Sequence, residues 1–270
     1  MQPTQSKSKM ERVYSQLKNP IVLFPGWGLN AKIWTPFLRL FKDHIQLFPL
    51  DYPGFGKNIN EPCPCKLETA LNWLDPFIPT PCILLGWSLG GQLALKYTTL
   101  FPKKVLGIIT IASTPCFLEK SNWPGVTRST FNDFYQRCHD PQKLLRRFIG
   151  LINQPVLLPE STRSVLQIAS FETPTTKSLQ ATLEWLETLD LRANLTQIKC
   201  PILQIFGQND NLVPVKVATI CSVPNPLIHK QVIINAGHHP FLTHPHIVFA
   251  HINDFLETIA FAIENGNCRV

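Results

Sequence analysis

One short stretch limits the folds open to this chain more than any other. Residues 82–91 read Cys-Ile-Leu-Leu-Gly-Trp-Ser-Leu-Gly-Gly, which is an apolar, strand-like run followed by the start of a helical pattern. A Gly-x-Ser-x-Gly sequence in that setting predicts a sharp turn that exposes Ser88 at the carboxyl end of the strand. Gly86 and Gly90 leave room where strand and helix pack closely. Ser88 is therefore a candidate nucleophile, although the motif alone also fits an ordinary serine in a glycine-rich turn.

The composition favours one large folded domain without disulfides or metal. The 270 residues are 44% hydrophobic and 16% charged, and the net charge of +7 favours an acidic partner. Four of the eight cysteines, Cys82, Cys116, Cys200 and Cys221, lie in or beside apolar runs and are expected to be core residues. The spacing of Cys63 and Cys65 is too short for a zinc-binding Cys-x₂-Cys pair. No apolar run reaches the ~18 residues of a membrane span. Residues 1–9 lack the apolar core of a signal peptide, so a cytoplasmic protein is expected.

Strand-like and helix-like segments alternate on both sides of a long helical stretch. The predicted strands are 12–14, 21–24, 45–50, 82–85, 105–111, 201–206 and 231–235. The predicted helices are 31–41, 69–77, 89–101, 128–138, 142–152, 161–171, 176–189, 215–221 and 246–263. This order predicts an α/β fold with a mostly parallel sheet flanked by helices. Residues 1–115 and 194–270 would form its core, and residues 116–193 an inserted helical cap.

Two later loops supply the partners that a serine nucleophile needs, a base and a carboxylate that orients the base. Asp210 follows the strand 201–206, and His238 and His239 follow the strand 231–235. We favour His238 because it directly follows Ala-Gly, whereas the backbone of His239 is biased toward extended geometry by the next residue, a proline. Each residue also has a simpler interpretation, Asp210 as a turn residue and either histidine as a solvated loop residue.

The loop after the first long strand, residues 25–30, reads Pro-Gly-Trp-Gly-Leu-Asn. Its two glycines would let the backbone approach a bound carbonyl group, so the amide of Trp27 is predicted to donate to an oxyanion. The amide of Leu89, at the start of the helix after Ser88, is predicted as the second donor. The alternative is that this loop is an ordinary strand-to-helix turn, in which the glycines are needed only for the backbone geometry.

Together, these loops and the helical insert resemble the α/β-hydrolases with a helical cap, over nearly the whole chain. Within that family the chain resembles the carboxylesterases of biotin synthesis more than it resembles other hydrolases. The particular segments are the elbow with its tryptophan, residues 112–117 and residues 123–125. Related hydrolases usually have histidine where this chain has Pro25, which removes a side chain that often braces the oxyanion loop.

The resemblance implies a role for each candidate residue. Ser88 would be the nucleophile, Asp210 the orienting carboxylate and His238 the base, and no cofactor would be needed. Trp27 and Leu89 would supply the oxyanion donors. The substrate would be a pimeloyl methyl ester attached to acyl carrier protein.

The predicted cap carries basic and aromatic residues of interest. Lys143, Arg146 and Arg147 share one helix face because they lie three and four residues apart. The resemblance implies that Arg147 and Arg163, helped by Lys143, hold the phosphopantetheine and acidic surface of the carrier, whereas a solvated basic face is the alternative. Candidates for lining an acyl channel are Phe117, Trp123, Phe148 and Leu151, for which packing within the cap is the commoner fate.

The expected activity is hydrolysis of that carrier-bound methyl ester through an acyl-enzyme. We expect a monomer that binds neither nucleic acid nor membranes. The first alternative is a general carboxylesterase or thioesterase that acts on small acyl esters. The second is a non-catalytic binding protein on the same scaffold, since a fold alone does not settle function.

Overall fold

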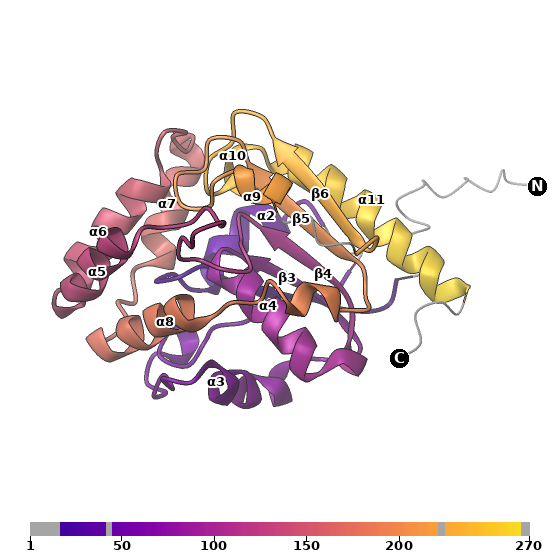
Figure 1. Cartoon of the computed structure of the whole chain (residues 1–270), viewed down its shortest axis with the longest axis horizontal. Helices are drawn as coiled ribbons and strands as arrows, with labels where there is room; N and C mark the ends of the chain where they lie inside the picture. The colour runs from indigo at the N-terminus through magenta and orange to yellow at the C-terminus, as the bar shows by residue number, and fades with distance from the viewer. Residues whose placement is uncertain (1–16, 42–44, 221–224, 266–270) are drawn as a thin grey trace, which may run out of the picture.

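A six-stranded parallel sheet forms the centre of the molecule (Figure 1), with the strand order β2-β1-β3-β4-β5-β6. The computed structural model describes residues 17–41, 45–220 and 225–265, so the predicted strand at 12–14 lies outside the described residues. The strands are β1 (Ile21–Phe24), β2 (Leu47–Pro49), β3 (Cys82–Trp87), β4 (Val105–Ile111), β5 (Ile202–Gly207) and β6 (Ile228–Ile233). The predicted mostly parallel α/β architecture is confirmed.

Helices connect the strands and cover the sheet. The α-helices are α2 (Thr35–Leu38), α3 (Leu67–Leu74), α4 (Leu89–Leu100), α5 (Arg128–Gln136), α6 (Pro141–Ile152), α7 (Glu160–Ala169), α8 (Thr176–Thr188), α9 (Lys216–Ile220), α10 (Pro240–Thr243) and α11 (Pro245–Glu264). Short 3₁₀ helices are η1 (Ala31–Trp34), η3 (Gly56–Asn58), η4 (Asp75–Phe77), η5 (Pro102–Lys104), η6 (Arg137–His139) and η7 (Asn194–Thr196).

The two long core helices, α4 and α11, cover opposite faces of the sheet. On β4, a Cβ at Gly107 would meet Ile259 of α11, while Thr110 faces Gly91 of α4. Positions three apart on a strand point to opposite faces. Every residue of β1, β3, β4 and β5 is buried, as expected of parallel strands covered on both sides.

Helix α11 is the one helix in the described part of the chain that is long and apolar enough to cross a membrane. One side of it packs against the sheet, where Val248, Ile252, Phe255, Leu256 and Ile259 are buried. It contacts β4, β5 and β6. In this structure α11 is therefore a core helix.

The segment between β4 and β5 contains the helices α5, α6, α7 and α8, close to the four that were predicted there. In Figure 1, α5, α6 and α7 lie together at the left of the molecule, at one end of the sheet. Within residues 116–193 of the described chain, β-type pairing is limited to isolated bridges. The division at residues 116 and 193 into core and cap remains a prediction.

Two predicted elements differ from the structure near the sheet edges. The helix predicted at 31–41 is the short 3₁₀ helix η1 followed by α2, which ends at Leu38. Strand β6 begins three residues before the predicted residue 231. It is an edge strand in which the exposed His229 and half-buried Lys230 and Gln231 obscure the apolar pattern.

Candidate active site

Ser88 lies in a strained turn between β3 and α4. Its backbone has φ 54° and ψ −119°, a conformation that residues other than glycine rarely adopt. Its N–H donates to the carbonyl of Ile111 over 2.9 Å, and its own carbonyl accepts a hydrogen bond from Ser113 Oγ at 2.7 Å. The glycines of the motif are required by close packing, since a Cβ on Gly86 would lie 2.1 Å from the carbonyl oxygen of Gly90. The sequence thus folds into the elbow that the motif predicts.

The loops after β5 and β6 bring the other two predicted residues to Ser88. His238 Nε2 lies 3.0 Å from Ser88 Oγ, and His238 Nδ1 lies 2.8 Å from Asp210 Oδ2. Asp210 Oδ1 accepts hydrogen bonds from the amides of Leu212 at 2.8 Å and Val213 at 3.0 Å. All three side chains are largely buried. The geometry suits proton transfer from the serine hydroxyl to the imidazole.

The neighbouring His239 is not part of this arrangement. It is fully buried, and neither ring nitrogen has a hydrogen-bond partner among the described residues. Burial of the ring, together with the adjacent His238, lowers the pKa of His239 from 6.5 to about 4. His239 is thus held neutral inside the fold at neutral pH.

This buried histidine gives a prediction for stability. Between about pH 6.5 and about pH 4, the unfolded chain binds a proton at residue 239 that the folded chain does not, so stability falls as the pH falls through this window. The full loss is on the order of 3 kcal/mol, because each pKa unit is worth about 1.4 kcal/mol. We expect urea unfolding of the variant His239→Leu to show a clearly smaller decrease in stability over this window than the wild type. Equal decreases in the two proteins would contradict this account.

The predicted oxyanion loop follows β1 and is braced from outside. Gly28 has a φ of +74°, which favours glycine. The hydroxyl of the buried Tyr52 donates to the carbonyl of Pro25. This contact supplies a brace for the loop that was expected to be missing because of Pro25. Leu89 is the first residue of α4, where backbone amides have no acceptor within the helix.

A cavity opens beside Ser88, and its walls are almost entirely apolar. Trp27 and Leu212 line it from the core, and the helical segment contributes Phe117, Phe131, Phe134, Phe148, Leu183 and Leu186 among others. The rings of Trp27 and Phe148 meet edge to face with centroids 5.0 Å apart. Of the four predicted lining residues, Phe117 and Phe148 line this cavity, whereas Trp123 and Leu151 do not.

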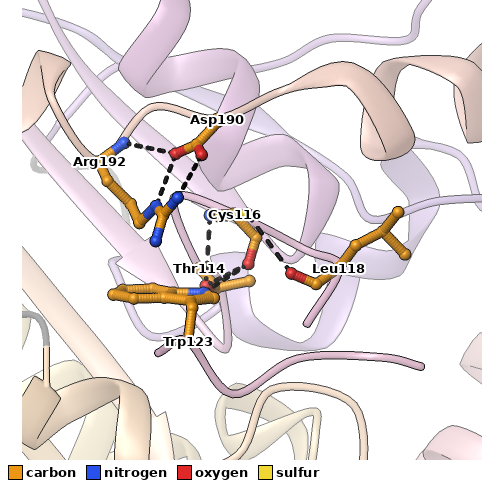
Figure 2. Close-up of polar contacts among 6 residues, drawn as sticks. All are labelled: Thr114, Cys116, Leu118, Trp123, Asp190 and Arg192. Carbon is orange, nitrogen blue, oxygen red and sulfur yellow. Dashed lines mark hydrogen bonds and ion pairs between the residues drawn. The ribbon is translucent and has the colours of Figure 1, made fainter. Parts of the chain in front are cut away.

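Trp123 instead belongs to a cluster where the helical segment leaves and rejoins the core (Figure 2). Its indole N–H donates to the carbonyl of Cys116 at 2.8 Å, which also accepts from Thr114 Oγ1 at 2.9 Å. Arg192 lies over the Trp123 ring and forms an ion pair with Asp190 at 2.6 Å. Cys116 and Asp190 pair through a β-bridge. The hydrogen bond to Cys116 holds the indole of Trp123 in this cluster, away from the cavity.

The predicted basic residues fall into two places. Lys143 and Arg147 of α6 line a second pocket together with Arg137. Arg147 forms an ion pair with Asp133 at 3.1 Å, and Arg137 pairs with the same carboxylate at 2.7 Å. Arg163 is exposed on α7 and is not among the residues that line this pocket.

Among the residues that the structure describes, no group of three or more His, Cys, Asp or Glu side chains is placed to hold a metal ion.

A family model described as alpha/beta hydrolase fold matches residues 19–245. Two curated relatives carry the name pimeloyl-[acyl-carrier protein] methyl ester esterase. The protein from Wigglesworthia glossinidia brevipalpis is 33% identical, with 88% of this chain and 93% of the relative covered. The protein from Serratia marcescens is 35% identical, with 83% and 89% covered.

Among solved structures, an esterase from Exiguobacterium antarcticum superposes with a TM-score of 0.77. It is 22% identical, and the match covers 88% of this chain and 92% of that structure. At this identity the likeness concerns the fold.

Proposed function

The chain belongs to the α/β-hydrolase family, and from this premise we propose that it is a serine carboxylesterase that hydrolyses the methyl ester of pimeloyl-[acyl-carrier protein]. One observation carries the chemistry: the imidazole of His238 joins Ser88 Oγ and Asp210 Oδ2 at hydrogen-bond distances beside an apolar cavity. The substrate follows from the names of the relatives, which match most of the chain.

The proposed mechanism has two steps. His238 Nε2 takes the proton of Ser88 Oγ as the oxygen attacks the ester carbonyl. The amides of Trp27 and Leu89 donate to the resulting oxyanion, and methanol leaves after protonation by His238. Water then attacks the acyl-enzyme by the same route, which releases the free carboxylate and restores Ser88. Asp210 keeps the proton of the neutral imidazole on Nδ1 throughout, so that Nε2 stays free to accept.

The apolar cavity suits the methylene chain of a pimeloyl group. Its walls include Phe117, Phe148 and Leu186, and Ser88 is a polar group at its edge. An apolar wall favours the neutral methyl ester over the charged carboxylate that hydrolysis produces, because burying an unpaired charge is costly. In this proposal residues 116–193 act as the cap that forms most of this wall.

The basic pocket on the same segment suits an acidic carrier. Lys143 and Arg147 are exposed on α6, and the apolar side of that helix faces the core through Leu144, Leu145 and Phe148. In this proposal, Arg147 and Arg163 bind anionic groups of the carrier, with Lys143 adding to the attraction. Such contacts weaken as salt screens the charges.

The test compares kcat/KM for methyl pimeloyl-acyl carrier protein with kcat/KM for free dimethyl pimelate. We expect the double variant Arg147→Ala, Arg163→Ala to lower the first about tenfold and to leave the second within about twofold, since exposed ion pairs at an interface contribute about 1 kcal/mol or less each. Raised salt should lower the first value in the wild type as well.

Lys103→Ala is the matched control. Lys103 is also an exposed cation, but it lies in η5 before β4, at the opposite edge of the sheet from Ser88. It should change neither value. Equal kcat/KM for the two substrates, unaffected by the double variant, would contradict the assignment to a carrier-bound ester and leave a general carboxylesterase.

A further inference from the structure

We propose that Trp87 is a positioning residue for the general base, because its indole N–H holds the main-chain carbonyl of His238. The inference rests on the proposed serine-esterase mechanism. Trp87 is the last residue of β3 and directly precedes Ser88. Its side chain is fully buried. Trp87 Nε1 donates to the carbonyl oxygen of His238 at 2.7 Å, and the two ring centroids are 5.5 Å apart.

The hydrogen bond acts on the base loop between two segments that have their own backbone hydrogen bonds. As far as Ala236 the loop is tied to the Asp210 loop, since the amide of Asn209 donates to the Ala236 carbonyl at 2.8 Å. From Pro240 onward the backbone is helical in α10. His238 lies between these two anchors, and Trp87 reaches its carbonyl from the strand that also carries the nucleophile.

The same indole also contacts the oxyanion loop. A Cβ on Gly26 would lie 2.7 Å from Cε3 and 2.8 Å from Cζ3 of Trp87, so Gly26 is required by the close approach of this ring. On another side the ring packs against Phe241, with centroids 5.4 Å apart. One side chain therefore fixes the spacing between the loops that carry Ser88, His238 and the predicted oxyanion donor Trp27.

This placement predicts an effect on the chemical step rather than on substrate binding. The imidazole of His238 meets Ser88 Oγ at 3.0 Å and Asp210 Oδ2 at 2.8 Å only while its backbone stays in place. A shift of the base costs rate because proton transfer depends on this geometry. Trp87 is not among the residues that line the cavity, so loss of its N–H should leave KM nearly unchanged.

The test replaces Trp87→Phe, which removes the N–H but keeps a buried ring. We expect kcat for dimethyl pimelate, normalised to folded protein, to fall about tenfold while KM stays within about twofold. Inactivation by a fluorophosphonate, which reports activation of Ser88, should slow by about the same factor. Replacement of Trp87 by 3-benzothienylalanine, which keeps the bicyclic ring and lacks the N–H, should give the same result if the phenylalanine variant folds poorly.

Trp34→Phe is the matched control, because Trp34 is equally buried and stacks on the same Phe241 with centroids 4.6 Å apart. Its Nε1 has no hydrogen-bond partner among the described residues. It should keep kcat within about twofold of the wild type. A wild-type kcat in both Trp87 replacements, or equal losses in the Trp87 and Trp34 variants, would overturn the inference. A wild-type protein that neither hydrolyses the ester nor reacts at Ser88 would instead refute the proposed function.

Discussion

Replacing Ser88 with alanine is expected to lower kcat for ester hydrolysis by about 10⁴-fold or more, since the variant has no nucleophile and only binding and oxyanion stabilisation remain. The fold should survive, because the strained turn is held by hydrogen bonds between the Ser88 backbone and Ile111 and Ser113, which the substitution keeps. The hydroxyl that is removed contacts His238. The measurement is kcat with dimethyl pimelate, together with mass spectrometry of the fluorophosphonate adduct. The adduct should be found on Ser88 in the wild type and be absent in the variant.

Residues that act as one unit lose activity together. The double variant Ser88→Ala, His238→Ala should therefore be no slower than Ser88→Ala alone. Ser113→Ala provides a second comparison, since Ser113 is buried next to the elbow and its hydroxyl donates to the main-chain carbonyl of Ser88 rather than to His238. It should still form the adduct. An adduct on Ser113, or substantial hydrolysis by Ser88→Ala, would show that the nucleophile is a different residue.

The parts of the site that the sequence predicts are those set by local spacing at the ends of strands. Ser88, Asp210 and His238 each follow a strand of the parallel sheet, and such strands end at one edge. Strand β6 was predicted three residues too late at its start, because its edge position mixes polar and apolar residues. The strand also ends at Ile233 rather than at the predicted residue 235, but His238 lies in the loop after it in either case.

Contacts between distant residues were not predictable in the same way. The hydrogen bonds from Trp87 to His238 and from Tyr52 to Pro25 join residues that lie far apart in the sequence, and no local sequence pattern indicates them. From the sequence, a tryptophan directly before the nucleophile is equally consistent with simple packing in the core. Trp123 is a predicted lining residue that instead lies outside the cavity, because its indole N–H donates to the carbonyl of Cys116.

The charged side chains on α5 and α6 show a further limit of prediction from the sequence. Helical spacing places Lys143 and Arg147 on one face of α6, as predicted. It does not reveal that Asp133 of α5 forms an ion pair with Arg147. This carboxylate neutralises part of the positive charge, so the proposed carrier would have to compete with an exposed ion pair, which is worth little.

Asp210→Asn tests what the carboxylate contributes and should lower kcat by about 10⁴-fold while the protein remains folded. Asp210 Oδ1 accepts from the amides of Leu212 and Val213, and Oδ2 accepts from His238 Nδ1. An asparagine has one oxygen for these two tasks. If that oxygen keeps the two amides, its NH₂ group faces Nδ1 and donates to it, which moves the imidazole proton to Nε2.

Nε2 would then present a hydrogen to Ser88 Oγ and could not accept its proton. If the amide flips, the two backbone N–H groups lose their acceptor, and the loop is destabilised instead. Asp75→Asn is the control, because Asp75 also accepts from two side chains, Tyr97 at 2.7 Å and Lys104 at 2.6 Å, but lies before β3 at the opposite edge. It should lower stability and leave kcat within about twofold. A loss below about tenfold in Asp210→Asn would mean that the imidazole keeps its tautomer without the carboxylate, and Asp210 would then be only a turn residue.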